Sequence, residues 1–495
     1  MKLTRNQVLN LILSAAIPVI FCLVILLFYP FETEFQFNPD EGLELEKVQM
    51  MMKGYPLYDS IWNDQPPMFT LLLGGVFRLF GTSVNTARVT VILLSAALIW
   101  GAFEFLYMAW GAWEAILGAL LLILLPFYLQ LSASVMRGLP ALTFAVLSLT
   151  ALAAWHKRRN WLWLIISAVL LAVSILIKLF TGFLVPIFGI GLILDEFRHA
   201  QNPHRWWKVL RPALVWGLVC LGIGLFAILF IIGIPNLDQV VLAPLKGVVA
   251  EQFGKAWRYS LYANLLGRLF LILSLLSVPY IFRFKNWLSL YVLAWLAFGY
   301  IFLLNYQPVW YHLQLLILVP AAMLGGLSLG SALRTLSRNL QSKKWITLSN
   351  LYAAGVLIVG LALAIQYVPE FYQQLQPVES TRGAAIEGRS QPNLFSADLY
   401  AIVQSEAPHT EWMVTDLPMY AFRSSLPVPP NTVVVSEKRI TSRLFSQNDM
   451  LQYVMDYQPE MVLFGRFNFS RVERYLKENY ARVYTSGDLK LYIKN

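Results

Sequence analysis

The chain is organised around Asn38-Pro39-Asp40-Glu41-Gly42 and the loop Gly54–Pro67, which reads GYPLYDSIWNDQPP. Both stretches lie in a polar segment between the first two long apolar runs. Residues 31–64 contain eight acidic and two basic side chains, whereas the whole chain has only 28 acids. A segment of this kind either sets the orientation of a membrane protein or carries out chemistry at the membrane surface, and we expect it to do both.

The composition indicates a membrane protein. Of 495 residues, 58% are hydrophobic and 13% are charged, and this charged fraction is about half that of a typical soluble domain. The formal net charge of +10 is explained by bases that collect in cytoplasmic loops, so no nucleic-acid partner is expected. Cys22 and Cys220 lie inside apolar runs and are expected to be buried thiols, without a disulfide or a metal.

The apolar runs predict a polytopic α-helical protein with about eleven spans, because roughly 17–25 apolar residues cross a bilayer as a helix. The predicted spans lie near 7–30, 84–107, 112–130, 139–155, 161–177, 179–194, 210–234, 262–282, 287–304, 310–331 and 346–367. The run from Pro67 to Phe80 is short and contains Arg78. We interpret it as a surface or re-entrant helix, or else as part of a long, tilted second span.

The distribution of charge predicts the orientation. With the N-terminus inside, the inner loops carry 15 bases against two acids, Asp195 and Glu196, in agreement with the positive-inside rule. The acidic segment then lies outside, and an odd number of spans places the C-terminal region outside as well. We therefore expect a multi-pass protein of the inner (plasma) membrane, with a cytoplasmic N-terminus and an extracytoplasmic first loop and C-terminal domain.

The C-terminal region differs in composition. From about residue 369 the long apolar runs end, and 14 acids are nearly balanced by 13 bases. Short β-rich runs alternate with helical patterns, as is typical of a small α/β domain; the runs are 412–415, 432–435, 461–464 and 490–493, and the helices 448–457 and 470–480. We predict a transmembrane domain over 1–368 with its first outer loop at 31–80, a linker over 369–395, and an extracytoplasmic α/β domain over 396–495.

The start of the acidic motif has two interpretations. Asn38 suits a helix N-cap, Pro39 suits the first helical position, and Glu41 can close a capping box. An amphipathic helix ending at Gly54 would follow, and acids at its start would be stabilised by the helix dipole without any further role. Alternatively, Asp40 lies beside the membrane surface, where a carboxylate can deprotonate an acceptor hydroxyl as a general base.

Two further acids frame the aromatic loop that follows. Asp59 and Asp64 are either turn residues whose side chains bond to the nearby backbone, or a second acidic wall or gate of a site. The sequence leaves both interpretations open.

A lipid phosphate, if the protein binds one, needs basic partners near the outer surface. The bases on or near that side are Arg78, Arg88, Arg137, Lys178, Lys246, Lys255, Arg258 and Arg268. Among them we favour Arg137, Lys178 and Arg258. Lys178 separates two apolar runs, where it is either a snorkelling side chain at a helix end or a functional group. His312 lies in an aromatic cluster at an outer boundary, and we include it among the candidate binding residues.

Several chemistries have no signature in the sequence. There is no glycine-rich phosphate loop and no nucleophile-elbow serine motif. The five histidines are scattered without zinc-ligand spacing. The sequence therefore requires no cofactor and no divalent metal.

Several motifs resemble the GT-C superfamily of integral-membrane glycosyltransferases. The resemblance is carried by Asp40-Glu41-Gly42, Gly54, Tyr58-Asp59, Pro66-Pro67, Leu79-Phe80-Gly81 and Ala87-Arg88, with weaker matches at Lys178-x-x-Thr181-Gly182 and Trp310–Gln314. It is sharpest with the protein O-mannosyltransferase and aminoarabinose-transferase branches, glycosyltransferase families 39 and 83.

The resemblance implies a polyprenyl- or dolichyl-phosphate sugar donor, an inverting single displacement and an active site on the outer face. Asp40 would be the base or the acceptor-orienting residue, and Glu41 its partner. Many relatives have an acid in the loop after the third span, where this chain has Arg137-Gly138. This difference makes Arg137 a candidate phosphate contact.

We therefore predict a hexosyl- or pentosyltransferase of the cell envelope that uses a lipid-linked donor and a lipid, glycan or protein acceptor. Two alternatives stay open. One is a non-enzymatic flippase or carrier for a lipid-linked sugar, in which the acidic loop is a gate. The other is an oligosaccharide ligase or polymerase with the same outer site.

Overall fold

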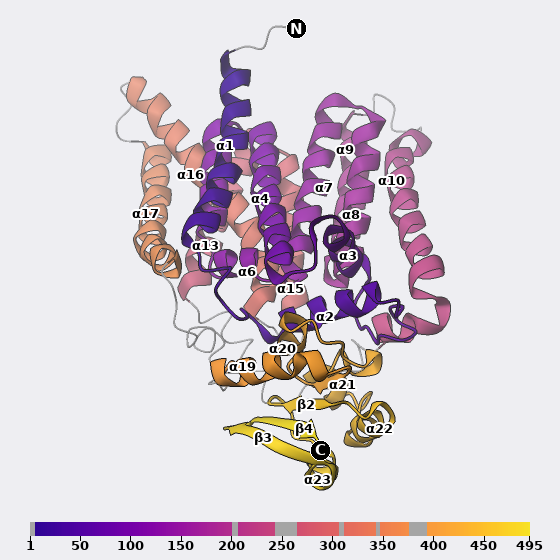
Figure 1. Cartoon of the computed structure of the whole chain (residues 1–495). Coiled ribbons are helices and arrows are strands. Elements are labelled where there is room, and N and C mark those ends of the chain that lie inside the picture. Colours follow the sequence, from indigo (N-terminus) through magenta and orange to yellow (C-terminus); the bar gives the residue numbers. More distant parts are fainter. Residues whose placement is uncertain (1–4, 200–205, 243–264, 306–310, 343–346, 376–393) are drawn as a thin grey trace.

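The computed structural model describes residues 5–199, 206–242, 265–305, 311–342, 347–375 and 394–495. Figure 1 shows a bundle of long helices that carries a small layer of helices and strands at one end. The start of the first helix and the C-terminal sheet lie at opposite ends of this bundle.

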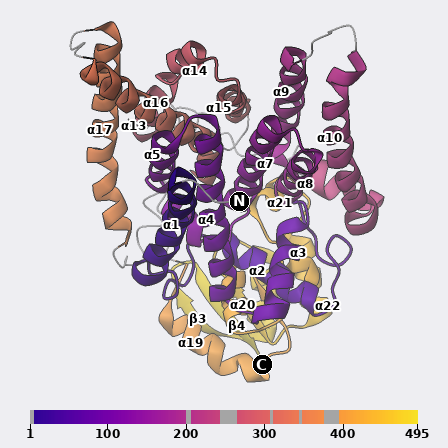
Figure 2. The ribbon, with the colours of Figure 1, turned by 90° about the horizontal axis from the view of Figure 1, so that it is seen from above.

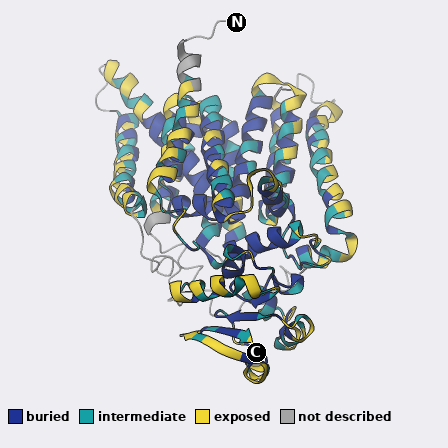
Figure 3. Ribbon diagram, viewed as in Figure 1, coloured by how far each residue is buried: buried dark blue, intermediate teal, exposed yellow. Residues whose placement is uncertain are grey.

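The bundle consists of long apolar helices and a few shorter ones. They are α1 (Arg5–Phe28), α4 (Val84–Ala109), α5 (Ala112–Ile123), α6 (Tyr128–Ala133), α7 (Gly138–Arg158), α8 (Trp161–Ile177), α9 (Leu184–His199), α10 (Trp206–Ala227), α13 (Leu265–Leu275), α14 (Val278–Phe284), α15 (Leu288–Asn305), α16 (Leu315–Gln341) and α17 (Leu348–Leu375). Figure 3 shows that buried residues concentrate in the centre of the bundle, while exposed apolar residues cover its outside.

The protein is a multi-pass membrane protein. Within the described residues, seven helices have 18 or more residues and are apolar enough to cross a membrane, and these coincide with seven of the eleven predicted spans. The predicted spans 7–30, 112–130 and 161–177 contain shorter apolar helices. The span predicted at 262–282 is divided between α13 and α14.

The segment between α1 and α4, which the sequence predicts to be the first outer loop, contains two helices, α2 (Pro39–Met52) and α3 (Met68–Phe80). Gly81, with φ +88°, separates α3 from α4, so the alternative of one continuous tilted span is not observed. Helix α2 was expected to lie at the membrane interface with one face in water. Instead, every residue from Glu41 to Met50 is buried, because the helix packs between the bundle, which supplies Arg88 and Arg137, and the C-terminal domain.

The C-terminal domain is an α/β unit with helices α19 (Ala397–Glu406), α20 (Pro418–Arg423), α21 (Glu437–Thr441), α22 (Gln447–Tyr457) and α23 (Ser470–Asn479). Its strands are β1 (Met413–Thr415), β2 (Met461–Phe464), β3 (Tyr480–Ser486) and β4 (Leu489–Lys494), in the order β1-β2-β4-β3. Strands β1 and β2 are parallel, and the other two pairs are antiparallel.

One predicted strand is not observed, and one observed strand was not predicted. The run Val433–Val435 follows the turn Pro430–Thr432 and is buried, but it is not a strand. Its sequence alone resembled that of a strand. Strand β3 was missed because six of its seven residues are exposed or partly exposed, without alternation of apolar residues. The predicted linker also began too early, since α17 continues through Pro369 to Leu375. Residues 376–393 lie outside the described residues.

The C-terminal domain shares a hydrophobic core with the first outer loop. One cluster of buried side chains joins Leu45, Val48 and Phe69 to Met419 and Tyr420. Figure 2 shows α2 and α3 lying over this domain. Gly42 allows the closest approach, since a Cβ added there would lie 2.5 Å from the backbone nitrogen of Met419.

We predict that Gly42→Ala weakens the packing of α20 on α2. Backbone atoms cannot move aside as a flexible side chain can, so overpacking should cost about 1–3 kcal/mol. Thermal unfolding in detergent should show a lower Tm. The control is Gly75→Ala on α3, where an added Cβ meets nothing within 4 Å and helix propensity favours alanine. Equal melting temperatures for the two variants would contradict the predicted packing.

Candidate functional site

The first outer loop presents Asp40 at the start of α2. The Asn38 side chain accepts a hydrogen bond from the Asp40 N–H at 2.8 Å, and Pro39 is the first helical residue, as predicted. The Asn38 amide also donates to the Tyr311 hydroxyl at 3.3 Å, which ties this helix end to the turn before α16. The Asp40 side chain is 52% exposed. Its carboxylate is therefore accessible at the boundary between the bundle and the C-terminal domain.

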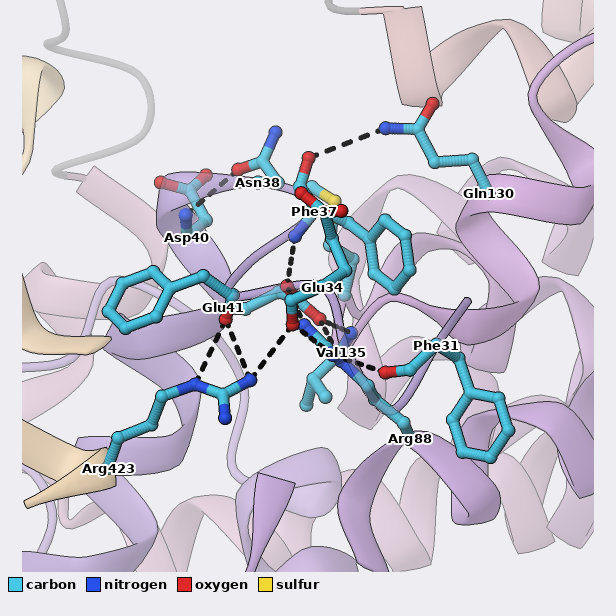
Figure 4. Close-up of polar contacts among 12 residues, drawn as sticks. Phe31, Glu34, Phe37, Asn38, Asp40, Glu41, Arg88, Gln130, Val135 and Arg423 are labelled. Carbon is cyan, nitrogen blue, oxygen red and sulfur yellow. Dashed lines mark hydrogen bonds and ion pairs between the residues drawn. The ribbon is translucent and has the colours of Figure 1, made fainter. Parts of the chain in front are cut away.

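Glu41 has a different environment from Asp40, although the two are adjacent in sequence (Figure 4). Its carboxylate forms an ion pair with Arg88 of α4 at 3.1 Å, and both side chains are completely buried. It also accepts hydrogen bonds from the backbone N–H groups of Phe37, at 2.6 Å, and Val135, at 2.8 Å. A capping box would have used the Asn38 N–H, so the predicted box is replaced by this buried network.

The segment before α2 is held from two sides. The Arg88 guanidinium donates to the carbonyl oxygens of Phe31 and Glu34. From α20, Arg423 donates to the carbonyls of Glu34 and Phe35, each at 2.9 Å. The loop that leads into Asp40 is thus clamped between the membrane helices and the C-terminal domain.

A basic cluster lies beside the face of α2 that carries Asp40, and we define it as Lys47 of α2, Arg137 before α7 and Lys178 after α8. The Arg137 Nη2 lies 2.6 and 2.7 Å from the two carboxylate oxygens of Glu44. The Lys47 Nζ lies 2.9 Å from Glu44 and 3.3 Å from the Asn63 side-chain oxygen. Lys47 and Arg137 thus share the single carboxylate of Glu44.

Arg137 keeps hydrogen-bonding capacity for a ligand. Its side chain is 4% exposed, yet its Nε and Nη1 have no hydrogen-bond partner within the part of the chain that the structure describes. Buried polar groups without partners are costly, so an anion placed here would stabilise the site. Burial, aided by the charge of Arg137, also lowers the pKa of Lys47 to about 8.

Lys178 and His312 complete this region. Lys178 ends α8 in an extended conformation, with φ −155°. Burial and the nearby Arg137 lower the pKa of Lys178 to about 8, although Asp40 and other acids favour its charged form. The His312 ring lies near Gly138, and its Nδ1 has no partner among the described residues.

The other predicted acids are in different positions. Asp64 forms an ion pair at 3.1 Å with Lys438 of α21. Burial raises its pKa, but Lys438, Arg137 and Lys47 outweigh that effect and hold the pKa below its usual value. Asp59 is exposed and accepts a hydrogen bond from Asn236 at 2.8 Å. Asp64 thus lies close to the basic cluster, whereas Asp59 lies apart from it.

Arg258 lies outside the described residues. Within these residues, no group of three or more His, Cys, Asp or Glu side chains is arranged to hold a metal ion.

Sequence reasoning missed Glu44 and Lys47. Both were detectable, because they follow Asp40 at positions i+4 and i+7 and so share one face of a helix. Their sequence neighbours Leu45 and Val48 are fully buried in the core. No pattern in the sequence indicated that Lys438 and Asn63 also contact residues of this site.

Residues 64–223 match the family model of dolichyl-phosphate-mannose-protein mannosyltransferases. No curated protein sequence matches the chain.

Solved structures are similar over nearly the whole chain. ArnT from Cupriavidus metallidurans bound to undecaprenyl phosphate is 14% identical, with a TM-score of 0.60 and 97% of each chain covered. The archaeal oligosaccharyltransferase AglB from Archaeoglobus fulgidus, in complex with an inhibitory peptide and a dolichol-phosphate, is 11% identical, with a TM-score of 0.58. That match covers 98% of this chain and 74% of that chain.

The chain has the fold of these structures, the GT-C fold. This confirms the predicted fold class, a polytopic helical protein with a C-terminal α/β region. In this fold, Asp40 and the basic cluster lie where the membrane helices meet the C-terminal domain.

We predict that Arg88→Met strongly destabilises the protein. Removing one partner of a buried ion pair leaves the other charge unpaired, which typically costs about 3–5 kcal/mol. Lower abundance in solubilised membranes and a lower Tm should result. The double variant Glu41→Gln, Arg88→Met should recover part of this loss because no buried charge remains unpaired. As a control, Arg78→Met removes an exposed base of α3; equal losses in Arg78→Met and Arg88→Met would contradict the structural role of the pair.

Proposed function

We propose that the protein transfers a sugar from a polyprenyl-phosphate donor to an acceptor on the outer face of the membrane. The observation that carries this proposal is the basic cluster beside Asp40. Arg137 has two buried nitrogen atoms without a partner among the described residues, and Lys178 lies near enough to Asp40 for the two charges to interact. A lipid phosphate supplies the oxygen atoms that such a cluster can bind.

The proposed reaction is a single displacement. The Asp40 carboxylate accepts the proton of an acceptor hydroxyl, and the hydroxyl oxygen attacks the anomeric carbon of the donor. The bond between that carbon and the phosphate oxygen breaks with inversion, and both bonding electrons leave with the phosphate. Arg137 and Lys178 stabilise the charge that grows on the departing lipid phosphate. Where the acceptor is itself a phosphate, Asp40 orients it instead.

In this proposal Glu41 is a positioning residue. Its carboxylate is occupied by Arg88 and by two backbone N–H groups, so it acts through the position of α2 and touches no substrate. Asp64, held by Lys438, forms the acidic side of the same site. His312, a candidate substrate-binding residue, lies beside Gly138 at the start of α7 and close to Lys178.

Two kinds of comparison support the donor class. ArnT and AglB, which have similar folds, are described with undecaprenyl phosphate and dolichol-phosphate. The matching family model is named for a dolichyl-phosphate-mannose donor. The charge asymmetry of the loops supports an extracytoplasmic site in the inner (plasma) membrane, with the N-terminus in the cytoplasm.

We predict that Asp40→Asn abolishes transfer while the protein remains at normal abundance. Loss of a general base should lower the rate roughly 10²–10⁴-fold, since Asn cannot accept the proton. The assay follows consumption of radiolabelled polyprenyl-phosphate sugars in detergent. The control Asp398→Asn changes an exposed acid on α19 and should leave transfer intact.

Full transfer by Asp40→Asn would contradict the proposed mechanism. Tight donor binding without donor consumption by the native protein would favour the alternative, a non-enzymatic flippase or carrier for the lipid-linked sugar.

We also predict that donor binding weakens as the pH rises through about 8, the pKa to which burial lowers Lys178 and Lys47. Below this pH both amines carry the charge that attracts phosphate, and above it they lose that charge. Titration of undecaprenyl phosphate binding between about pH 6.5 and 9.5 tests this. In the double variant Lys47→Arg, Lys178→Arg the alkaline loss should disappear, because guanidinium stays charged; an unchanged pH profile would refute the assignment.

A further inference from the structure

The C-terminal domain contains a polar cleft of about 540 Å³. It lies between α21, the loop after β2, the first turn of α23 and the turn between β3 and β4. Side chains that line it include Glu437, Thr441, Arg466, Phe467, Asp488 and Lys490. A volume of this order is within the range of small-molecule sites.

The cleft is joined to the acids of the first outer loop at two points. Arg466 lines the cleft, and its Nη2 lies 3.9 Å from the Asp40 carboxylate. Helix α21 contributes Glu437 to the cleft and binds Asp64 through Lys438. A molecule in the cleft would therefore lie next to the proposed general base.

The wall that carries Arg466 is preorganised. The Asp416 carboxylate, which is completely buried, accepts hydrogen bonds from the N–H groups of Gly465 and Arg466 at 2.9 Å and of Phe467 at 2.8 Å. These three bonds fix the loop after β2. The Nη1 of Arg466 is buried and has no hydrogen-bond partner among the described residues, so one donor remains for a ligand.

The chemistry of the cleft favours a neutral, hydroxyl-rich ligand. Lys490 is neutralised by Glu473 at 2.7 Å, and the carboxylates of Glu437 and Asp488 oppose the charge of Arg466. This balance disfavours a polyanion. Carboxylates, a guanidinium donor and the aromatic ring of Phe467 together match the alternating hydroxyl groups and apolar faces of a carbohydrate.

We propose that this cleft binds the glycan portion of the acceptor. The inference rests on the proposed glycosyl transfer and adds to it the class of the acceptor and its direction of approach. The basic cluster contacts the donor phosphate from the membrane side of Asp40, where Lys178 lies, and the acceptor reaches Asp40 from the side of Arg466. The two substrates thus meet at one carboxylate from opposite sides.

The experiment uses the full-length protein in detergent and a panel of methyl glycosides and soluble disaccharides as probes. Binding is followed by saturation-transfer NMR in the absence of donor. At least one probe should bind, and the double variant Glu437→Gln, Asp488→Asn should reduce its signal at least about fivefold. Glu478→Gln, an exposed acid of α23 outside the cleft, is the matched control and should leave binding unchanged. Lys178→Gln, in the donor site, should also leave it unchanged.

The outcomes separate this inference from the proposed function. Absence of binding by every probe, or equal binding by the native protein and the double variant, overturns the acceptor cleft even if the native protein consumes donor. Probe binding that depends on the cleft, in a protein that consumes no polyprenyl-phosphate sugar, refutes the transferase and leaves a glycan-binding cleft. Dependence of both transfer and probe binding on the cleft residues supports both proposals.

Discussion

The structure depends on the buried ion pair between Glu41 and Arg88. Both side chains are completely inaccessible to solvent, so their desolvation must be offset by good geometry and by further hydrogen bonds. The N–H groups of Phe37 and Val135 donate to the Glu41 carboxylate. The Arg88 guanidinium donates to the carbonyls of Phe31 and Glu34, in the segment before α2. One pair of charges thereby fixes the first outer loop to α4 and to the start of the α7 region.

This constraint explains why two adjacent acids have different environments. Neighbouring helical residues point in directions about 100° apart, so when Glu41 faces the interior, Asp40 faces the boundary with the C-terminal domain. Glu44 and Lys47 follow on the Asp40 face and meet Arg137 there. The C-terminal domain then closes over α2, with Arg423 clamping the loop and Arg466 approaching Asp40. Asp40, the basic cluster and the proposed acceptor cleft are thus arranged around one helix.

Much of this arrangement could be predicted from local sequence patterns. Asn38 and Pro39 specify the start of α2, apolar length identifies the long membrane helices, and the change in composition after α17 marks the α/β region. Local patterns failed where tertiary contacts decide. The exposed strand β3 has no apolar alternation, and the run Val433–Val435 is buried without being paired.

The composition of the site depended on long-range contacts. Arg88 meets Glu41 across 47 positions, and Lys438 meets Asp64 across 374. No periodicity in the sequence connects such residues. Only the fold brings them together, so the sequence could not show that the Glu41 carboxylate is paired with Arg88.

The most direct test of the central claim is an experimental structure of the protein with undecaprenyl phosphate. The account predicts phosphate density bound by Arg137 and Lys178, within reach of Asp40, with the lipid chain running along the membrane helices. Phosphate bound elsewhere, with Arg137 in contact only with Glu44, would contradict the proposed donor site.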